Sequence, residues 1–132
     1  MGHPTIYPTG VTVYNPEKCW NGFTIFQALE VGAVLMNMNG RENKVWKGVH
    51  GFPNKLFPGG YLMTSRGSRD GRYGVQDGLD LVQIDWDGNV VWKFDRNEYI
   101  EDPGIPGRWM ARSHHDYQRE GSTTGYYAPG ME

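Results

Sequence analysis

The stretch ARSHHDYQREG, residues 111–121, concentrates the residues of this chain that could do chemistry. Two adjacent histidines, His114 and His115, stand between Arg112 and Arg119. Histidine titrates near neutral pH and donates from both ring nitrogens when it is protonated, and the arginine guanidinium offers a planar fork that suits an oxyanion. Such donors stabilise negative charge that develops on oxygen during a group transfer. The stretch therefore predicts an anion-binding site; the alternative is a polar turn in which both rings only hydrogen-bond the loop backbone.

The two histidines are not expected to act together. Neighbouring side chains of a strand point to opposite faces, so only one of His114 and His115 should face the site. We favour His115, which an internal repeat matches with His50. The same alternation argues against a metal site, because two neighbours on a strand cannot easily chelate one ion together with Asp116. We expect Asp116 to orient a ring or to cap a turn.

A second arginine-rich stretch, SRGSRDGRYG at 65–74, contains three arginines and several glycines. It lacks the G-x-x-x-x-G-K-[ST] spacing with which a phosphate-binding loop surrounds a nucleotide. A long exposed hairpin tip explains it better.

The composition limits what could position these residues. The chain has 132 residues, enough for one ordinary domain, and its net charge of -2 gives no support for binding to nucleic acid or to a membrane surface. No apolar run approaches the roughly 20 residues of a transmembrane helix, and the single Cys19 excludes an internal disulfide. Nineteen glycines accompany five Trp, eight Tyr and five Phe. Aromatic segments separated by glycines are typical of many short strands joined by tight turns.

Two segments predict β-hairpins. Residues 34–47 turn at Asn39-Gly40, and residues 81–94 turn at Asp87-Gly88. Asn-Gly and Asp-Gly between β-rich runs favour a tight turn because these residues accept a positive φ. The best helix candidate, residues 21–31, has no strong cap, and we interpret it as extended.

The two hairpins belong to a longer repeat. Each ends in Val-Trp-Lys, at Trp46 and Trp92, and the separation of His50 from Tyr61 equals that of His115 from Tyr126. Repeat units of roughly 34–62 and 81–127, with about four short strands each, are typical of β-propeller blades. We expect the two tryptophans to occupy equivalent places between blades. The alternative is one β-sandwich whose hairpins are alike by chance.

The predicted fold class is therefore all-β, with about two antiparallel propeller-type blades. A closed propeller needs roughly four to eight blades, so residues 1–132 would form the N-terminal part of an incomplete domain. Uncovered blade faces and strand edges favour association. The remaining blades are then expected from the same gene or from a partner chain.

Four stretches together resemble the bacterial and archaeal aryl-sulfate sulfotransferase family, in its N-terminal portion: HPTIYPTGVTVYNPEKCWNGFTIF, GFPNKLFPGGYLM, LDLVQIDWDGNVVWKF and WMARSHHDYQREG. The resemblance implies a six-bladed propeller that transfers a sulfuryl group from an aryl sulfate to a phenol through a sulfated histidine. It implies a supporting histidine in the HHD stretch and the nucleophilic histidine in later blades. No cofactor is implied.

These inferences define the expected site and function. His115 and His114 are the catalytic candidates, Arg112, Arg119 and His50 the substrate-binding candidates, and no metal ligand is expected. The chain would be part of the sulfotransferase and inactive when isolated, with aryl sulfate and phenol as substrates. The alternative is a non-catalytic propeller module, or a truncated fragment, that needs blades from another chain. The N-terminus MGHPTIYPTG lacks a signal-peptide pattern, which favours the cytoplasm, although relatives are often exported.

Overall fold

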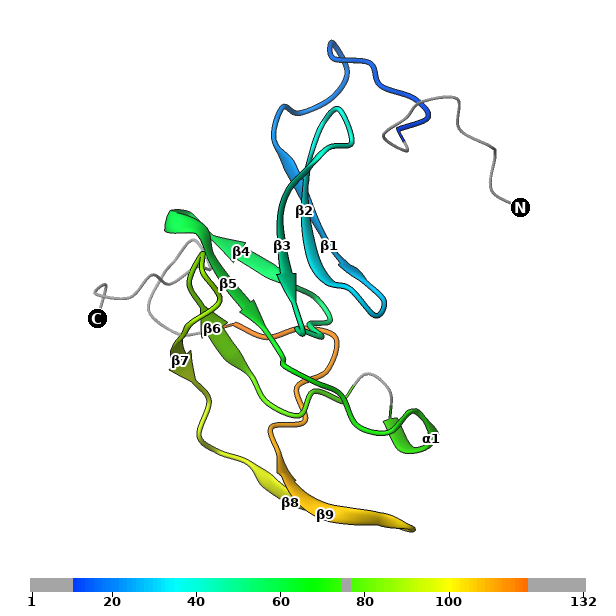
Figure 1. Cartoon of the computed structure of the whole chain (residues 1–132), viewed down its shortest axis with the longest axis vertical. Coiled ribbons are helices and arrows are strands. Elements are labelled where there is room, and N and C mark those ends of the chain that lie inside the picture. The colour runs from blue at the N-terminus through cyan, green and yellow to red at the C-terminus, as the bar shows by residue number, and fades with distance from the viewer. Residues whose placement is uncertain (1–10, 75–76, 119–132) are drawn as a thin grey trace.

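The computed structural model describes residues 11–74 and 77–118 and shows them as antiparallel strands with almost no helix (Figure 1). The helical parts of this region are the 3-10 turn η1 (Pro58–Gly60) and the four-residue α1 (Gly71–Gly74). The all-β prediction is confirmed. No closed ring of sheets is seen among the described residues.

Sheet A contains β1 (Phe23–Ala28), β2 (Gly32–Asn37) and β3 (Glu42–Lys47), in that spatial order. The strand β1 confirms the extended interpretation for Phe23–Ala28, whereas residues 29–31 form a turn. Its sequence FTIFQA is rich in β-branched and aromatic residues, which fit a pleated surface.

Sheet B is a four-stranded antiparallel meander. It contains β4 (Lys55–Phe57), β5 (Tyr61–Thr64), β6 (Val82–Ile84) and β7 (Val90–Lys93), again in sequence order. The chain then forms a separate hairpin, β8 (Glu98–Asp102) with β9 (Ile105–Met110), which projects away from sheet B (Figure 1).

The turns β2–β3 and β6–β7 have the same construction, and both predicted hairpins are confirmed. The side-chain oxygen of Asn37 accepts backbone N–H groups two and four residues later, and Asp85, 48 positions further on, does the same. In each turn the glycine three residues later has a positive φ, 73° at Gly40 and 92° at Gly88. An Asx-type bond of this kind replaces part of the backbone pairing and fixes the turn.

The register shows that the predicted equivalence of Trp46 and Trp92 is wrong. Lys44 pairs with Leu35, and Trp92 pairs with Gln83, which lies 48 positions after Leu35. Trp92 therefore corresponds to Lys44. Phe94 takes the place of Trp46. The physical reason is that two more residues separate the turn glycine from the tryptophan in the first hairpin. Because the side-chain period of a strand is two, the shift moves the aromatic along the strand without changing its face.

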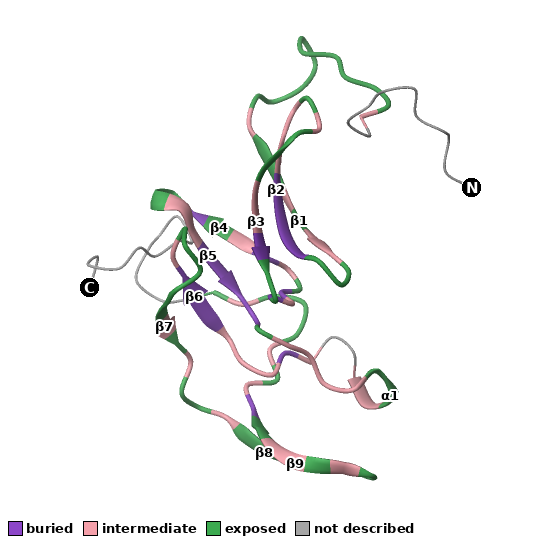
Figure 2. Ribbon diagram, in the orientation of Figure 1, coloured by how far each residue is buried: buried purple, intermediate pink, exposed green. Residues whose placement is uncertain are grey.

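Trp46 lies at the centre of the core between the two sheets and is only 3% exposed. Its indole Nε1 donates to the carbonyl oxygen of Asp85 at 3.2 Å, and its ring meets Trp86 edge to face at 5.3 Å between centroids. The buried cluster around it includes Ala33, Leu35, Val49, Leu62, Val82 and Ile84. Buried segments of β2, β3, β5 and β6 therefore form one core (Figure 2).

The two sheets stack head to tail. Val82 and Ile84 of sheet B face sheet A. Their counterparts 48 positions earlier are Val34 and Met36 of sheet A. These two alternate with the core residue Leu35, so they lie on the face of sheet A opposite to sheet B. The face that sheet B packs against sheet A thus corresponds to the face of sheet A that points away from sheet B. The contact between the two sheets is therefore heterologous, unlike the contact of a symmetric pair.

Candidate functional site

The two histidines lie in a tight turn and not on a strand. The carbonyl oxygen of His114 accepts the N–H of Asp116 at 2.6 Å, and His115 between them has a φ of 56°. Their ring centroids are 4.1 Å apart at an interplanar angle of 77°, and both residues are exposed. The prediction that the rings point to opposite faces is wrong, because the turn replaces strand alternation and brings them side by side.

Asp77 joins the basic groups of this site through one carboxylate. Its Oδ1 lies 3.5 Å from His114 Nδ1, and its Oδ2 lies 3.1 Å from Arg69 Nη1 and 3.6 Å from Arg112 Nε. Arg112 is also bonded to Glu98, with Nη1 to Oε2 at 3.0 Å. The Asp77 carboxylate attracts the His114 ring when that ring is protonated.

Arg69 donates a hydrogen bond to Asp77 and also binds Asp102. Its guanidinium forms a two-bond fork with Asp102, Nε to Oδ2 at 2.9 Å and Nη2 to Oδ1 at 2.5 Å. The hydrogen bonds from Arg69 hold the pKa of the Asp102 carboxyl below its usual value. The fork also ties the β5–β6 connection to strand β8, because Asp102 is the last residue of that strand.

The arginines of residues 65–74 are structural, and the prediction of a long exposed hairpin tip holds only in part. β5 and β6 do pair antiparallel across this connection. Each arginine, however, is matched by a carboxylate: Arg66 by Asp80 at 2.7 Å, Arg69 by Asp102, and Arg72 by Asp70 at 2.9 Å. Arg69 is largely covered by its partners, whereas Arg66 and Arg72 are paired but remain exposed.

Backbone pairing aligns Arg112 with this connection. The N–H of Ala111 donates to Leu79 at 2.9 Å, the N–H of Arg112 donates to Gly78 at 3.0 Å, and Gly78 donates back to Ser113 at 2.8 Å. A side chain on Gly78 would collide with the Ser113 hydroxyl. The absence of a side chain at Gly78 therefore lets these two segments approach with the Ser113 hydroxyl in its observed position.

The other end of the histidine turn is anchored on β4. Lys55 Nζ lies 2.5 Å from Asp116 Oδ1 and donates to the carbonyl oxygen of Tyr117 at 2.7 Å, and the Tyr117 hydroxyl donates to the carbonyl oxygen of Pro53. Of the two roles expected for Asp116, its contacts fit a turn cap rather than a ring partner, because its Oδ1 accepts the backbone N–H of Tyr117 at 2.8 Å and pairs with Lys55. The hydrogen bond from Lys55 lowers the pKa of Asp116, and burial raises the pKa of Tyr117.

An aromatic side chain stands beside the histidine pair. The Phe52 ring meets the His115 ring at 5.6 Å between centroids and is 47% exposed. His50, two residues earlier, lines a different hollow of about 210 Å³ with Gln27 and Arg66. The structure thus brings Arg112, His114 and His115 together and leaves His50 apart; Arg119 and Tyr126 lie outside the described residues.

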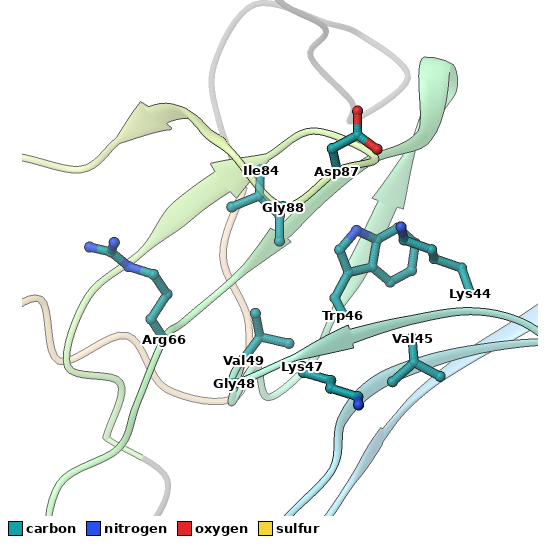
Figure 3. A pocket seen from close by; sticks show the side chains of 10 residues that line it. All are labelled: Lys44, Val45, Trp46, Lys47, Gly48, Val49, Arg66, Ile84, Asp87 and Gly88. Carbon is teal, nitrogen blue, oxygen red and sulfur yellow. The ribbon is translucent and has the colours of Figure 1, made fainter.

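A larger cavity, of about 430 Å³, opens between the sheets away from the histidine turn (Figure 3). Trp46 and Lys44 line one side, and Arg66 lies at the other end. The Lys44 ammonium stands over the Trp86 ring at 5.3 Å. Arg66 is paired with Asp80, and Lys44 and Lys47 are the two lysines that line this cavity.

The site differs from the predicted one in two members that sequence reasoning missed. Asp77 precedes Arg112 by 35 residues and His114 by 37, and no spacing rule connects it to them. Phe52 lies two residues after His50, and its role follows only from its contact with the His115 ring. Within the described residues, no group of three or more histidine, cysteine or acidic side chains is placed to hold a metal ion. Nor does any described helix have the length and apolarity needed to cross a bilayer.

In comparisons with protein-family models, with curated proteins and with solved structures, nothing matches this chain. The candidate site is therefore defined by its own geometry: two adjacent imidazoles, a guanidinium, an orienting carboxylate and an aromatic wall.

Proposed function

We propose that this chain forms the first blades of a β-propeller and supplies one wall of an aryl-sulfate sulfotransferase site. The observation that carries the proposal is the pairing of His114 and His115 at 4.1 Å with Phe52 against the second ring. Two imidazoles side by side suit an oxyanion, and an adjacent aromatic ring suits the aryl group that bears it.

The stacking of the sheets supports the propeller. Sheet B packs on sheet A through the face that corresponds to the outward face of sheet A, so further sheets can be added in the same sense. Heterologous contacts that close on themselves generate rings. The four-stranded meander of sheet B is the size of one blade.

The residues take distinct roles in this proposal. His115, whose described contacts are ring contacts, donates to the sulfuryl oxygens. His114, with Nδ1 toward Asp77, presents Nε2 to the same group. The sulfuryl group moves from the aryl oxygen to a histidine in another blade and then to a phenol, so this chain binds and positions but does not form the covalent intermediate.

A non-catalytic interaction module is the second candidate. It is favoured by the pairing of Arg112 with Glu98 at 3.0 Å and with Asp77 at 3.6 Å. An arginine already matched by two carboxylates attracts an anion less than a free one, because part of its charge is compensated. In this case the histidine turn would be a structural joint between blades.

The two candidates are separated by titrating the purified chain with 4-nitrophenyl sulfate, 4-nitrophenol and inorganic sulfate, followed by NMR of the histidine rings. The sulfotransferase proposal expects the aryl sulfate to shift the rings of His114 and His115 and to bind more tightly than either partial ligand. His115→Ala should abolish the shifts, while Lys93→Ala, which removes a cation on β7, should leave them unchanged. The chain alone should release no 4-nitrophenol. If the ligand shifts no histidine ring, or if it causes the same shifts in the His115→Ala chain, the sulfotransferase proposal is refuted and the interaction module remains.

A further inference from the structure

Lys44 is a cation on the core-facing side of sheet A. It pairs across the strands with Leu35, a member of the buried cluster, so its side chain lies on the same face as Leu35 and Trp46. Lys44 is half-buried, whereas Lys47, three positions later, points to the other face of β3 and is exposed (Figure 3). A lysine stem packs along apolar surface while its ammonium stays accessible. The two lysines of β3 thus serve different surfaces.

The Lys44 ammonium is held by aromatic rings. It stands 5.3 Å from the centroid of the Trp86 ring and 5.9 Å from that of the Trp46 ring. Among the described residues, no carboxylate lies within ion-pair distance of it. The face of an aromatic ring attracts a cation through its quadrupole but carries no net charge that could neutralise it. This ammonium therefore keeps its full charge for an incoming anion.

The cavity beside this ammonium combines the charge with apolar walls (Figure 3). Its volume of about 430 Å³ falls within the roughly 300–1,000 Å³ of small-molecule sites. Val49 and Ile84, both buried, line it between Lys44 at one end and Arg66 at the other. A ligand with a negative charge near Lys44 would thus place the rest of its atoms against apolar side chains.

The other charges around the cavity determine the kind of anion. A phosphate or another dianion is best held by several donors or by a guanidinium fork, but Arg66 Nε already donates to Asp80 at 2.7 Å. Asp87, on the β6–β7 turn, also lines the cavity and opposes a second negative charge. The ammonium of Lys44 is a compact point charge, which suits one carboxylate. The cavity therefore favours a monoanion over a dianion.

We propose that this cavity is a binding site for a small monocarboxylic acid. The carboxylate pairs with the Lys44 ammonium, and the apolar body of the ligand packs against Trp46, Val49 and Ile84. None of the residues that line the cavity belongs to the histidine turn. The site is therefore separate from the one proposed above and does not depend on the sulfotransferase chemistry.

The test uses benzoate as the probe and benzamide as its uncharged counterpart of nearly the same size and shape. Each is titrated into the purified full chain, and NMR follows the indole Nε1–H resonance of Trp46, which is assigned with Trp46→Phe. We expect benzoate to shift this resonance along a saturable curve. Benzamide should bind at least about tenfold more weakly, because a hydrogen bond to a charged group contributes that much or more.

Two matched variants separate Lys44 from charge in general. Lys44→Met keeps a straight side chain over the indoles and removes the charge, so it should weaken benzoate binding by about tenfold or more. Lys47→Met makes the same change on the other face of β3. It should leave the dissociation constant within about twofold of the parent value at physiological salt, because exposed charges are screened. The benzamide comparison needs no substitution, so it tests the proposal even if Lys44→Met does not fold.

Three results would overturn the proposal: benzamide that binds as tightly as benzoate, equal losses in the two methionine variants, or no saturable shift of the Trp46 resonance. Benzoate that shifts the histidine rings and leaves the Trp46 indole unchanged would also overturn it, since the anion would then bind at the histidine turn. The aryl-sulfate titration follows the histidine rings and the benzoate titration follows the Trp46 indole. Failure of either proposal is therefore seen separately from failure of the other.

Discussion

Removing the Trp46 side chain should cost the fold more than any other tryptophan substitution. The indole is 3% exposed and lies between two sheets, so the cavity left by Trp46→Ala cannot collapse unless the sheets move. Large aromatic truncations of this kind cost about 3–5 kcal/mol. We expect the upper part of that range, because the change also deletes the hydrogen bond to Asp85 and the edge-to-face contact with Trp86.

The assay is urea unfolding followed by far-UV circular dichroism. Trp46→Phe keeps most of the apolar volume and loses the donor, and should cost about 1–2 kcal/mol. Trp20, which is 95% exposed, supplies the matched control, and Trp20→Ala should change the free energy of unfolding by less than about 0.5 kcal/mol. Equal losses for the Trp46 and Trp20 alanine variants would show that the sheets are not held together by this residue, and the stacking argument would fail with it.

Three further outcomes can be measured on the same chain. Gly32→Ala should destabilise far more than Gly88→Ala in urea unfolding, because both have a positive φ, 132° and 92°, but only Gly32 would also place a methyl group against neighbouring backbone. Arg69→Ala should raise the pKa of Asp102, measured by carboxyl NMR titration, and make the β8–β9 hairpin easier to cleave by protease; an unchanged pKa would contradict the observed fork. Burial raises the pKa of Tyr117, so above about pH 10 the unfolded chain loses a proton that the folded chain keeps, and the free energy of unfolding falls as pH rises. Tyr117→Phe should flatten that decline in alkaline melts, and a parent chain with no decline would refute the burial argument.

Local patterns predicted the strands better than they predicted the partners of each residue. The turns at Asn39-Gly40 and Asp87-Gly88 follow from residues that accept a positive φ, and this information lies within a few positions of the turn. The equivalence of Trp46 with Trp92 failed because the motif Val-Trp-Lys was matched without counting from the turn glycine. Register is set by the turn and by bulges, so a repeated motif is a weaker guide than the distance to the turn.

The geometry of the candidate site was likewise not predictable from local sequence patterns. The histidine pair was found from sequence, but its geometry was predicted as strand alternation, whereas His115 has a φ of 56° and the rings lie together. The positive φ belongs to a tight turn held at both ends, by Asp77 on His114 and by Lys55 on Asp116. Both contacts join segments far apart in the chain. Periodicity carries no information on contacts of this kind, so only the fold reveals them.

The sequence repeat and the structural sheets are out of phase. The repeat unit 34–62 begins with the hairpin β2–β3 of sheet A and ends with β4 and β5 of sheet B. The first unit therefore completes sheet A and begins sheet B, so the boundary between the two sheets falls inside the repeated sequence. Sequence repeat and sheet need not share a boundary, because a hairpin turn is fixed by residues close to it, whereas membership of a sheet depends on pairing between segments far apart in the chain.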